Sequence, residues 1–134
     1  MKGTAKGKFE VKLAPQPADD YADGKDLGRM TIDKHFLGDM EGSSKGQMLT
    51  GMTAVSGSAA YVAIERVNGA LAGRTGTFIL QHTGTMARGA QSLVVKVVPD
   101  SGTGEFAGID GTMAIDISNG LHLYTFEYTL PDQE

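Results

Sequence analysis

The chain contains no cysteine, which excludes a disulfide framework and thiolate chemistry. Long apolar runs are also missing, since none approaches the roughly 20 residues that span a bilayer. Residues 1–13 alternate and lack the apolar stretch of about 7–15 residues that a signal peptide needs. Positive charge is scarce, because 12 Lys and Arg stand against 16 Asp and Glu, with a net charge of −4 and a pI near 5.3. These absences argue against nucleic acid and anionic membranes as partners, and they favour a cytoplasmic protein.

The chain does have enough apolar material for one core. Its 134 residues are 40% hydrophobic and 21% charged, a balance typical of one globular domain. Glycine is common at 19 residues, about twice its average share of roughly 7%. We therefore expect a single domain over residues 1–134, with many bends and turns.

The dominant hydrophobic period is two, which predicts β-strands. In residues 8–13, Phe9, Val11 and Leu13 alternate with charged side chains, as expected of a half-buried strand. No segment shows a convincing helical period. Eight strands are expected, at residues 8–13, 28–36, 46–53, 57–67, 77–83, 92–98, 113–117 and 121–130.

Turn signals separate these strands. The polar segment 15–25 is predicted to be a surface loop, and Asn68 with Gly69 forms the strongest two-residue hairpin signal. Short strands with turn signals about every 8–12 residues are typical of an antiparallel sandwich or barrel. The glycines favour a barrel, because strongly coiled strands need glycine at bends and bulges. We therefore predict an all-β fold, a small eight-stranded antiparallel β-barrel closed like a lipocalin, either filled by side chains or holding one small ligand.

Familiar cofactor and catalytic motifs are absent. Gly102, Gly104 and Gly108 superficially suggest a phosphate-binding loop, but a β-like segment follows where a dinucleotide fingerprint needs a helix. The three histidines lie far apart in sequence without metal-ligand spacing, so no metal site is expected. A Gly-x-Ser-x-Gly nucleophile elbow is missing as well. We expect no cofactor.

Polar side chains that interrupt the apolar strands are more informative. Alternation places them on the same strand faces as large apolar residues, so an inward orientation would bring them into the lumen. Burial moves the pKa of carboxylates and imidazoles toward neutrality, which suits proton transfer. The candidates are Glu65 as general base or acid, His82 and His122 as its proton partners, Tyr61 and Tyr124 as hydrogen-bond donors to a developing oxyanion, and Phe78 and Phe126 as the apolar wall.

Two other placements stay open for these residues. They could form a buried structural network in which Glu, His and Tyr side chains satisfy one another. Alternatively, the opposite strand faces could point inward, which would leave Glu65 as an ordinary solvated charge. A single-residue bulge would be enough to exchange the two faces of a strand.

Several segments share one resemblance, namely residues 38–44, 57–66, 73–84, 98–104 and 122–130. They resemble the bacterial DUF3224 family, whose name states that no function is assigned. The resemblance runs from about Gly7 to Leu130. It implies a small eight-stranded barrel similar to plant allene oxide cyclase, and residues 101–111 look like the Gly-x-Gly-x-Phe-x-Gly-x-x-Gly segment of those cyclases. None of the catalytic residues of the cyclases can be matched onto this chain position by position.

Two hypotheses of function follow. In the first, the lumen holds an apolar small molecule, either as a binding protein or as an isomerase, cyclase or lyase with Glu65 as base. In the second, the barrel is filled and the protein acts through its outer surface as a homodimer or other homo-oligomer. The seven methionines fit either hypothesis, because methionine fills gaps in cores as readily as it lines interfaces.

Overall fold

The computed structural model describes residues 1–17 and 26–132, so most of the expected polar loop, residues 18–25, lies outside the described residues. The described residues form nine strands and no helix. The strands are β1 (Lys2–Pro15), β2 (Leu27–Gly38), β3 (Met40–Met52), β4 (Ala59–Leu71), β5 (Arg74–Ala87), β6 (Ala90–Val97), β7 (Thr103–Gly104), β8 (Asp110–Ser118) and β9 (Leu121–Thr129). In this part of the chain, nothing helical is available to cross a bilayer.

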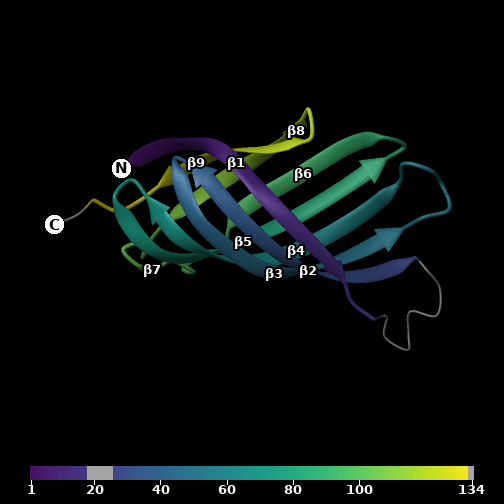
Figure 1. Ribbon diagram of the computed structural model, residues 1–134, viewed down its shortest axis with the longest axis horizontal. Coiled ribbons are helices and arrows are strands. Elements are labelled where there is room, and N and C mark those ends of the chain that lie inside the picture. The colour runs from purple at the N-terminus through teal and green to yellow at the C-terminus, as the bar shows by residue number, and fades with distance from the viewer. Residues whose placement is uncertain (18–25, 133–134) are drawn as a thin grey trace.

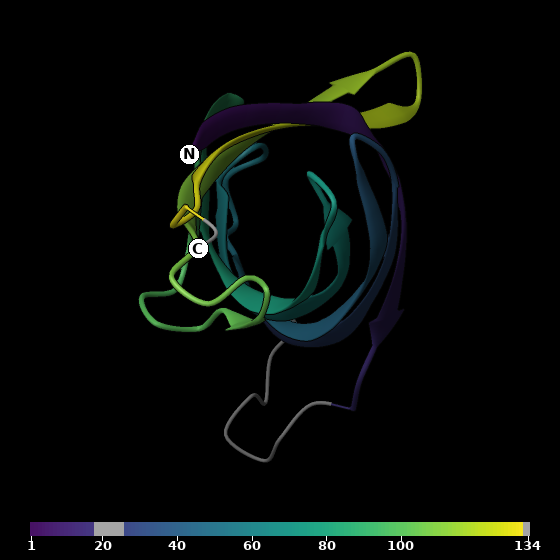
Figure 2. The same cartoon turned by 90° about the vertical axis from the view of Figure 1, so that its left-hand side faces the viewer.

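Eight of the strands close into one antiparallel barrel, seen from the side in Figure 1 and along its axis in Figure 2. The order around the ring is β4, β3, β2, β1, β9, β8, β6, β5, and β4 pairs with β5 to close it. Each of these pairings is antiparallel. The short β7 pairs with the first part of β5, beyond the end of β6. The predicted all-β, eight-stranded antiparallel barrel is therefore confirmed, with one additional strand.

The strongest hairpin signal in the sequence does not form a turn. Asn68 and Gly69 lie inside β4, paired with β3 on one side and β5 on the other. The turn comes at Ala72 and Gly73, which have φ of 55° and 76°, whereas Asn119 and Gly120 do turn, with φ of 51° and 78°. The dipeptide rule is local, and the pairing of β4 with both neighbours outweighs it.

One end of the barrel is filled by aromatic side chains. Phe78 stacks on Phe126 with ring centroids 5.6 Å apart, and Phe106 meets Phe78 edge-on at the same distance. All three are fully buried. Phe106 belongs to the segment after β7 and completes this group of buried rings, which we call the plug. At the same end the terminal ammonium of Met1 donates to the carbonyl of Leu130 at 2.7 Å, so the first and last strands are joined (Figure 2).

The barrel wall is weakest between β6 and β8. Their register in the described residues consists of the single pair Lys96 and Thr112, whereas β8 pairs with β9 along its whole length. Past that pair the β8–β9 hairpin leans out of the ring, as Figure 2 shows. We call this gap the seam. It lies toward the end of the barrel that is opposite to the aromatic plug.

Candidate functional site

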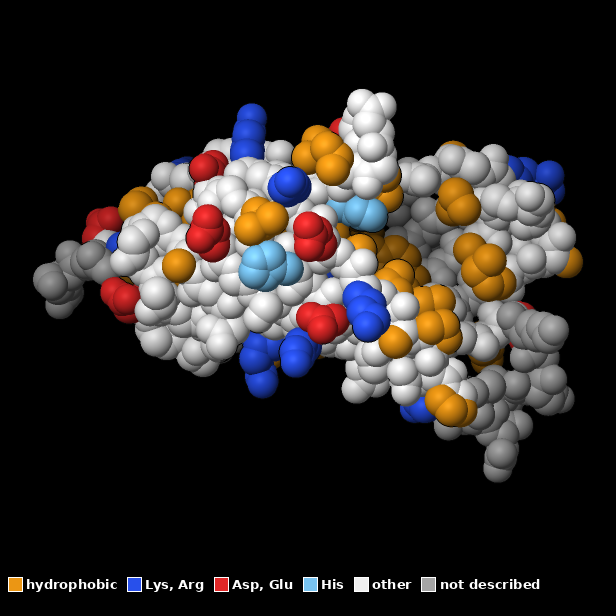
Figure 3. Space-filling view, viewed as in Figure 1, with side chains coloured by type: hydrophobic (Ala, Val, Ile, Leu, Met, Phe, Trp, Pro, Cys, Tyr) orange, Lys and Arg blue, Asp and Glu red, His pale blue; other side chains and the backbone are white. Residues whose placement is uncertain are grey.

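The half of the barrel away from the plug encloses a cavity of about 430 Å³, which we call the cup. Its wall is largely apolar, and the cup reaches the seam, because residues of both β6 and β8 line it. Figure 3 shows the opening as a hollow with apolar side chains inside it, beside the protruding hairpin. The apolar wall includes Phe9, Val11, Ile32, Met48, Leu93 and Ile115.

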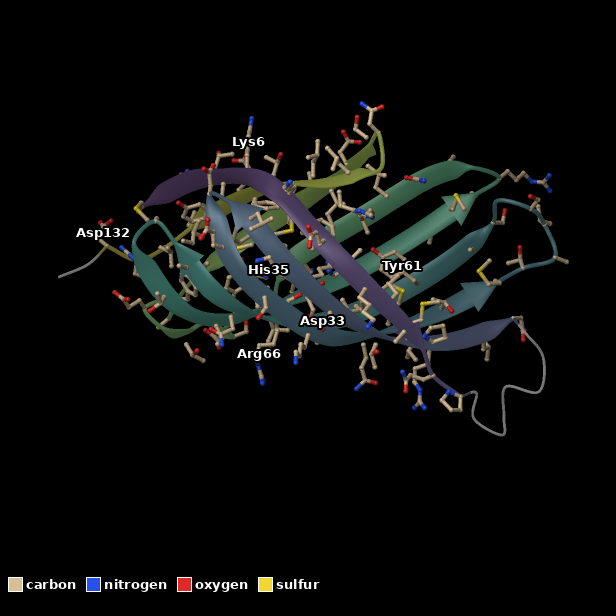
Figure 4. The ribbon with its side chains drawn as sticks, viewed as in Figure 1. Lys6, Asp33, His35, Tyr61, Arg66 and Asp132 are labelled. Atoms are coloured by element: carbon tan, nitrogen blue, oxygen red, sulfur yellow. The ribbon has the colours of Figure 1, made fainter. Side chains whose placement is uncertain are left out.

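Strand alternation decides which side chains enter the barrel. On β4, Ala63, Glu65 and Val67 are buried, while Val62 and Ile64 are 50% and 51% exposed. Tyr61 therefore shares the inward face with Glu65, as the alternation of the sequence predicts. In Figure 4, Tyr61 lies within the barrel and Arg66 of the same strand points away from it.

The floor of the cup rests on a buried cluster around Glu65. One carboxylate oxygen, Oε2, accepts from Lys34 Nζ at 2.8 Å and lies 2.6 Å from His82 Nε2. The other, Oε1, accepts from Ser44 Oγ at 2.9 Å. Gly46 of β3 is paired with Glu65, and a Cβ there would come within 2.9 Å of the Glu65 Cβ, so the strands approach closely behind the cluster. Through these hydrogen bonds, each polar side chain of the cluster has at least one partner within the protein.

The cluster holds Glu65 as a carboxylate. Burial by itself would raise its pKa, because an ion is disfavoured away from water. The hydrogen bond from His82 and the positive charge of Lys34 outweigh burial and lower the pKa from 4.5 to about 2. With both oxygens engaged and so low a pKa, Glu65 is a weak proton acceptor at neutral pH and is suited to orienting His82.

Tyr61 extends the cluster into the cup. Its hydroxyl lies 3.3 Å from His82 Nδ1, so Glu65, His82 and Tyr61 form a hydrogen-bonded chain. A neutral His82 that donates from Nε2 to Glu65 accepts the Tyr61 proton at Nδ1, whereas a protonated His82 donates at both nitrogens. Burial and the negative charge of Glu65 raise the pKa of Tyr61 above 10, so the phenol is protonated at neutral pH.

Two members of the cluster, Lys34 and Ser44, are absent from the sequence-based candidates. Lys34 is only 6% exposed, and its ammonium sits 4.7 Å from the centre of the Phe9 ring and 5.8 Å from that of Phe36. The available signal is alternation, since Ile32, Lys34 and Phe36 occupy one face of β2. A lysine between two buried apolar positions is a candidate for an ion pair in the interior.

The remaining sequence candidates are divided between the cup and the core. His122 lines the cup and packs against Phe9, with ring centroids 5.2 Å apart. Tyr124 is buried deeper, where its hydroxyl accepts from the Met40 amide at 3.0 Å and can donate to the carbonyl of Leu37 or Met40. Phe78 and Phe126 belong to the plugged end. The structure thus brings Tyr61, Glu65 and His82 together, places His122 at the cup wall, and leaves the other three candidates outside the cup lining.

No group of three His, Asp or Glu side chains within residues 1–17 and 26–132 converges in a way that could hold a metal ion. The floor itself offers the Glu65 carboxylate, the Lys34 ammonium, the Ser44 hydroxyl, the His82 imidazole and the Tyr61 phenol. These groups can bind a polar atom of a ligand and can move a proton along the chain from Tyr61 to His82.

Fold and site together define an antiparallel eight-stranded barrel with one plugged end and one hollow end. The model of the family described as protein of unknown function DUF3224 matches residues 5–128. The structure is similar to the crystal structure, at 1.84 Å resolution, of a DUF3224 protein with unknown function from Shewanella oneidensis MR-1. That similarity has a TM-score of 0.91 and 51% sequence identity, and it covers 99% of this chain and 100% of the other. The chain belongs to the DUF3224 family.

A search of curated proteins finds no match. The family model and the crystal structure confirm the resemblance to DUF3224, while the likeness to allene oxide cyclase stays a prediction. Neither comparison brings an activity or a ligand with it.

Proposed function

We propose that the protein binds an apolar small molecule in the cup. The observation that carries this proposal is a cavity of about 430 Å³ with apolar walls and a few polar groups gathered at its floor. Cavities of about 300–1,000 Å³ with this distribution of polarity are the usual form of small-molecule sites. A filled barrel would have no such space, so the cup favours a lumen ligand over a role confined to the outer surface.

Filling the cup tests this proposal. Thr50 lines the cup, and Thr83 lies exposed on the outer face of β5, so Thr50→Phe and Thr83→Phe are a matched pair of substitutions. The probe is N-phenyl-1-naphthylamine, a neutral dye whose fluorescence rises in apolar surroundings. The wild type and Thr83→Phe should bind it saturably at one site, and Thr50→Phe should bind at least about tenfold more weakly. Equal binding by both variants would place the dye outside the cup.

A second candidate function is acid–base catalysis in the same cup, of the isomerase, cyclase or lyase type. The hydrogen-bonded chain of Glu65, His82 and Tyr61 favours it, with distances of 2.6 Å and 3.3 Å between successive members. Because the pKa of Glu65 is about 2, the proton acceptor in this reaction would be His82, oriented by Glu65, and Tyr61 would face the substrate.

Deuterium exchange tests the catalytic candidate without a known substrate. In D2O, the protein should accelerate exchange at the carbon next to the carbonyl of 2-decanone, as followed by proton NMR. Tyr61→Phe and His82→Asn should each slow the exchange by about a hundredfold or more, the usual range for loss of a general acid or base. Exchange no faster than with free imidazole at equal concentration would exclude this chemistry for ketones and leave the binding function standing.

A further inference from the structure

The polar groups that face the cup differ in kind from those behind it. Lys34, Tyr61 and His82 line the cup, and all three can donate a hydrogen bond. Glu65 and Ser44 lie behind them and do not line it. Among the described lining residues there is no Asp or Glu, while His122 adds a second imidazole. The cup therefore presents donors and potential positive charge to its contents.

Lys34 has donor capacity left over. An ammonium carries three N–H groups, and within the described residues its hydrogen-bonded partner is Glu65 Oε2. Its other close neighbours are the rings of Phe9 and Phe36, which attract the charge but offer no oxygen or nitrogen acceptor. A ligand atom that accepts hydrogen bonds would use the remaining N–H groups without breaking the pair with Glu65.

We propose that the ligand is an apolar carboxylic acid, bound as its carboxylate. This rests on the proposed function, and it names the chemical class of the ligand. The apolar chain would lie against the walls of the cup. The carboxylate would accept from Lys34 and from the Tyr61 hydroxyl, whose proton would then point to the ligand and not to His82 Nδ1.

Other head groups fit this floor less well. An amine head would bring a second cation next to Lys34 in a cup whose described lining has no acidic side chain, so like charges would repel. An alcohol would accept from Lys34, but a charge-assisted hydrogen bond between two ions is about twice as strong as one between neutral groups. The lining therefore predicts an order of affinity in which the carboxylate comes first and the amine last.

Three ligands with the same chain test this order: decanoate, 1-decanol and decylamine, each titrated calorimetrically into the wild-type protein below its aggregation concentration. We expect decanoate to bind roughly ten to a hundred times more tightly than decanol. Equal affinities, or tighter binding of decylamine, would overturn the assignment of a carboxylate and leave the cup as a binding site. Absence of binding by all three would overturn the proposed function and this inference together.

Removal of the ammonium adds an internal check. In Lys34→Met, decanoate should lose much more affinity than decanol, because it loses a charge-assisted hydrogen bond, and the two should bind about equally weakly. The matched control is Lys45→Met on the exposed outer face of β3, which should leave all three affinities unchanged. A full decanoate preference in folded Lys34→Met would refute the role of this residue. Where Lys34→Met does not fold, the head-group series on the wild type decides by itself.

Discussion

Replacement of Glu65 by glutamine should destabilise the fold and remove part of its sensitivity to acid. The side chain keeps its shape, but Lys34 is left in the interior without its counter-charge. Breaking a buried ion pair in this way typically costs about 3–5 kcal/mol. The pKa supports a similar magnitude, since a value of about 2 in place of 4.5 corresponds to about 3 kcal/mol at about 1.4 kcal/mol per tenfold change.

The pH at which this stabilisation disappears follows from the direction of the shift. Because the pKa of Glu65 is lower in the folded state than in the unfolded chain, its contribution is fully present above about pH 4.5. It is lost as the pH falls from there toward about 2, where the folded protein also takes up the proton. Glu65→Gln has no carboxyl at this position, so its free energy of unfolding should not show this loss at acid pH.

Urea unfolding of both proteins at a series of pH values from about 7 to about 3 measures the effect. The difference in the free energy of unfolding should be about 3 kcal/mol near neutral pH and should shrink steadily below about pH 4.5. Glu10→Gln, at an exposed position of β1, is the control and should stay within about 0.5 kcal/mol of the wild type. A difference that is constant across this pH range would refute the account of Glu65 as a charge held by its buried partners.

Three further predictions concern other parts of the barrel. Phe106→Ala should cost about 3–5 kcal/mol in urea unfolding, because it empties the plug, yet it should leave dye binding in the cup unchanged; a cost under about 1 kcal/mol would mean that the plug does not hold the fold. The pKa of Tyr61, followed by NMR of labelled tyrosine, should lie above 10 and move back toward 10 in Glu65→Gln; titration at or below 10 in the wild type would contradict the burial of its hydroxyl. Hydrogen exchange should be faster for the seam-facing amides of residues 90–95 and 114–118 than for amides of β9, and equal protection on both sides of β8 would show that the seam is closed in solution.

The fold could be predicted because the alternation that assigns side chains to the two faces of a strand lies within that strand. Alternation along residues 61–67 sorts Glu65 and Tyr61 to one face and Val62 and Ile64 to the other, and the structure keeps that division. The failure at Asn68 and Gly69 has the opposite origin. Whether a dipeptide turns depends on strands paired with it from elsewhere in the chain, and those pairings are not visible in the dipeptide.

The site was predictable only in part, for a related reason. Alternation tells which face a residue occupies but not at which height along the barrel it sits. Tyr124 and His122 share a face of β9, yet one is locked in the core by the backbone of Leu37 and Met40 while the other lines the cup. Lys34 meets Glu65 across β3 because of the register of three strands, and a lysine in an alternating strand ordinarily reads as solvent-exposed.

The plugged end of the barrel affects which positions can be substituted during evolution. Much of the stability of the fold comes from one end of the barrel, where Phe106 packs on the stacked rings and the first and last strands are joined. The opposite end therefore contributes less to stability. Wall residues that do not pack against the core, such as Met48, Thr50 and Met52, could then be replaced to suit a different ligand at little cost in stability. A designer looking for a small receptor scaffold would begin at these wall positions. Natural variation within the family should gather there as well, while the aromatic end stays the same.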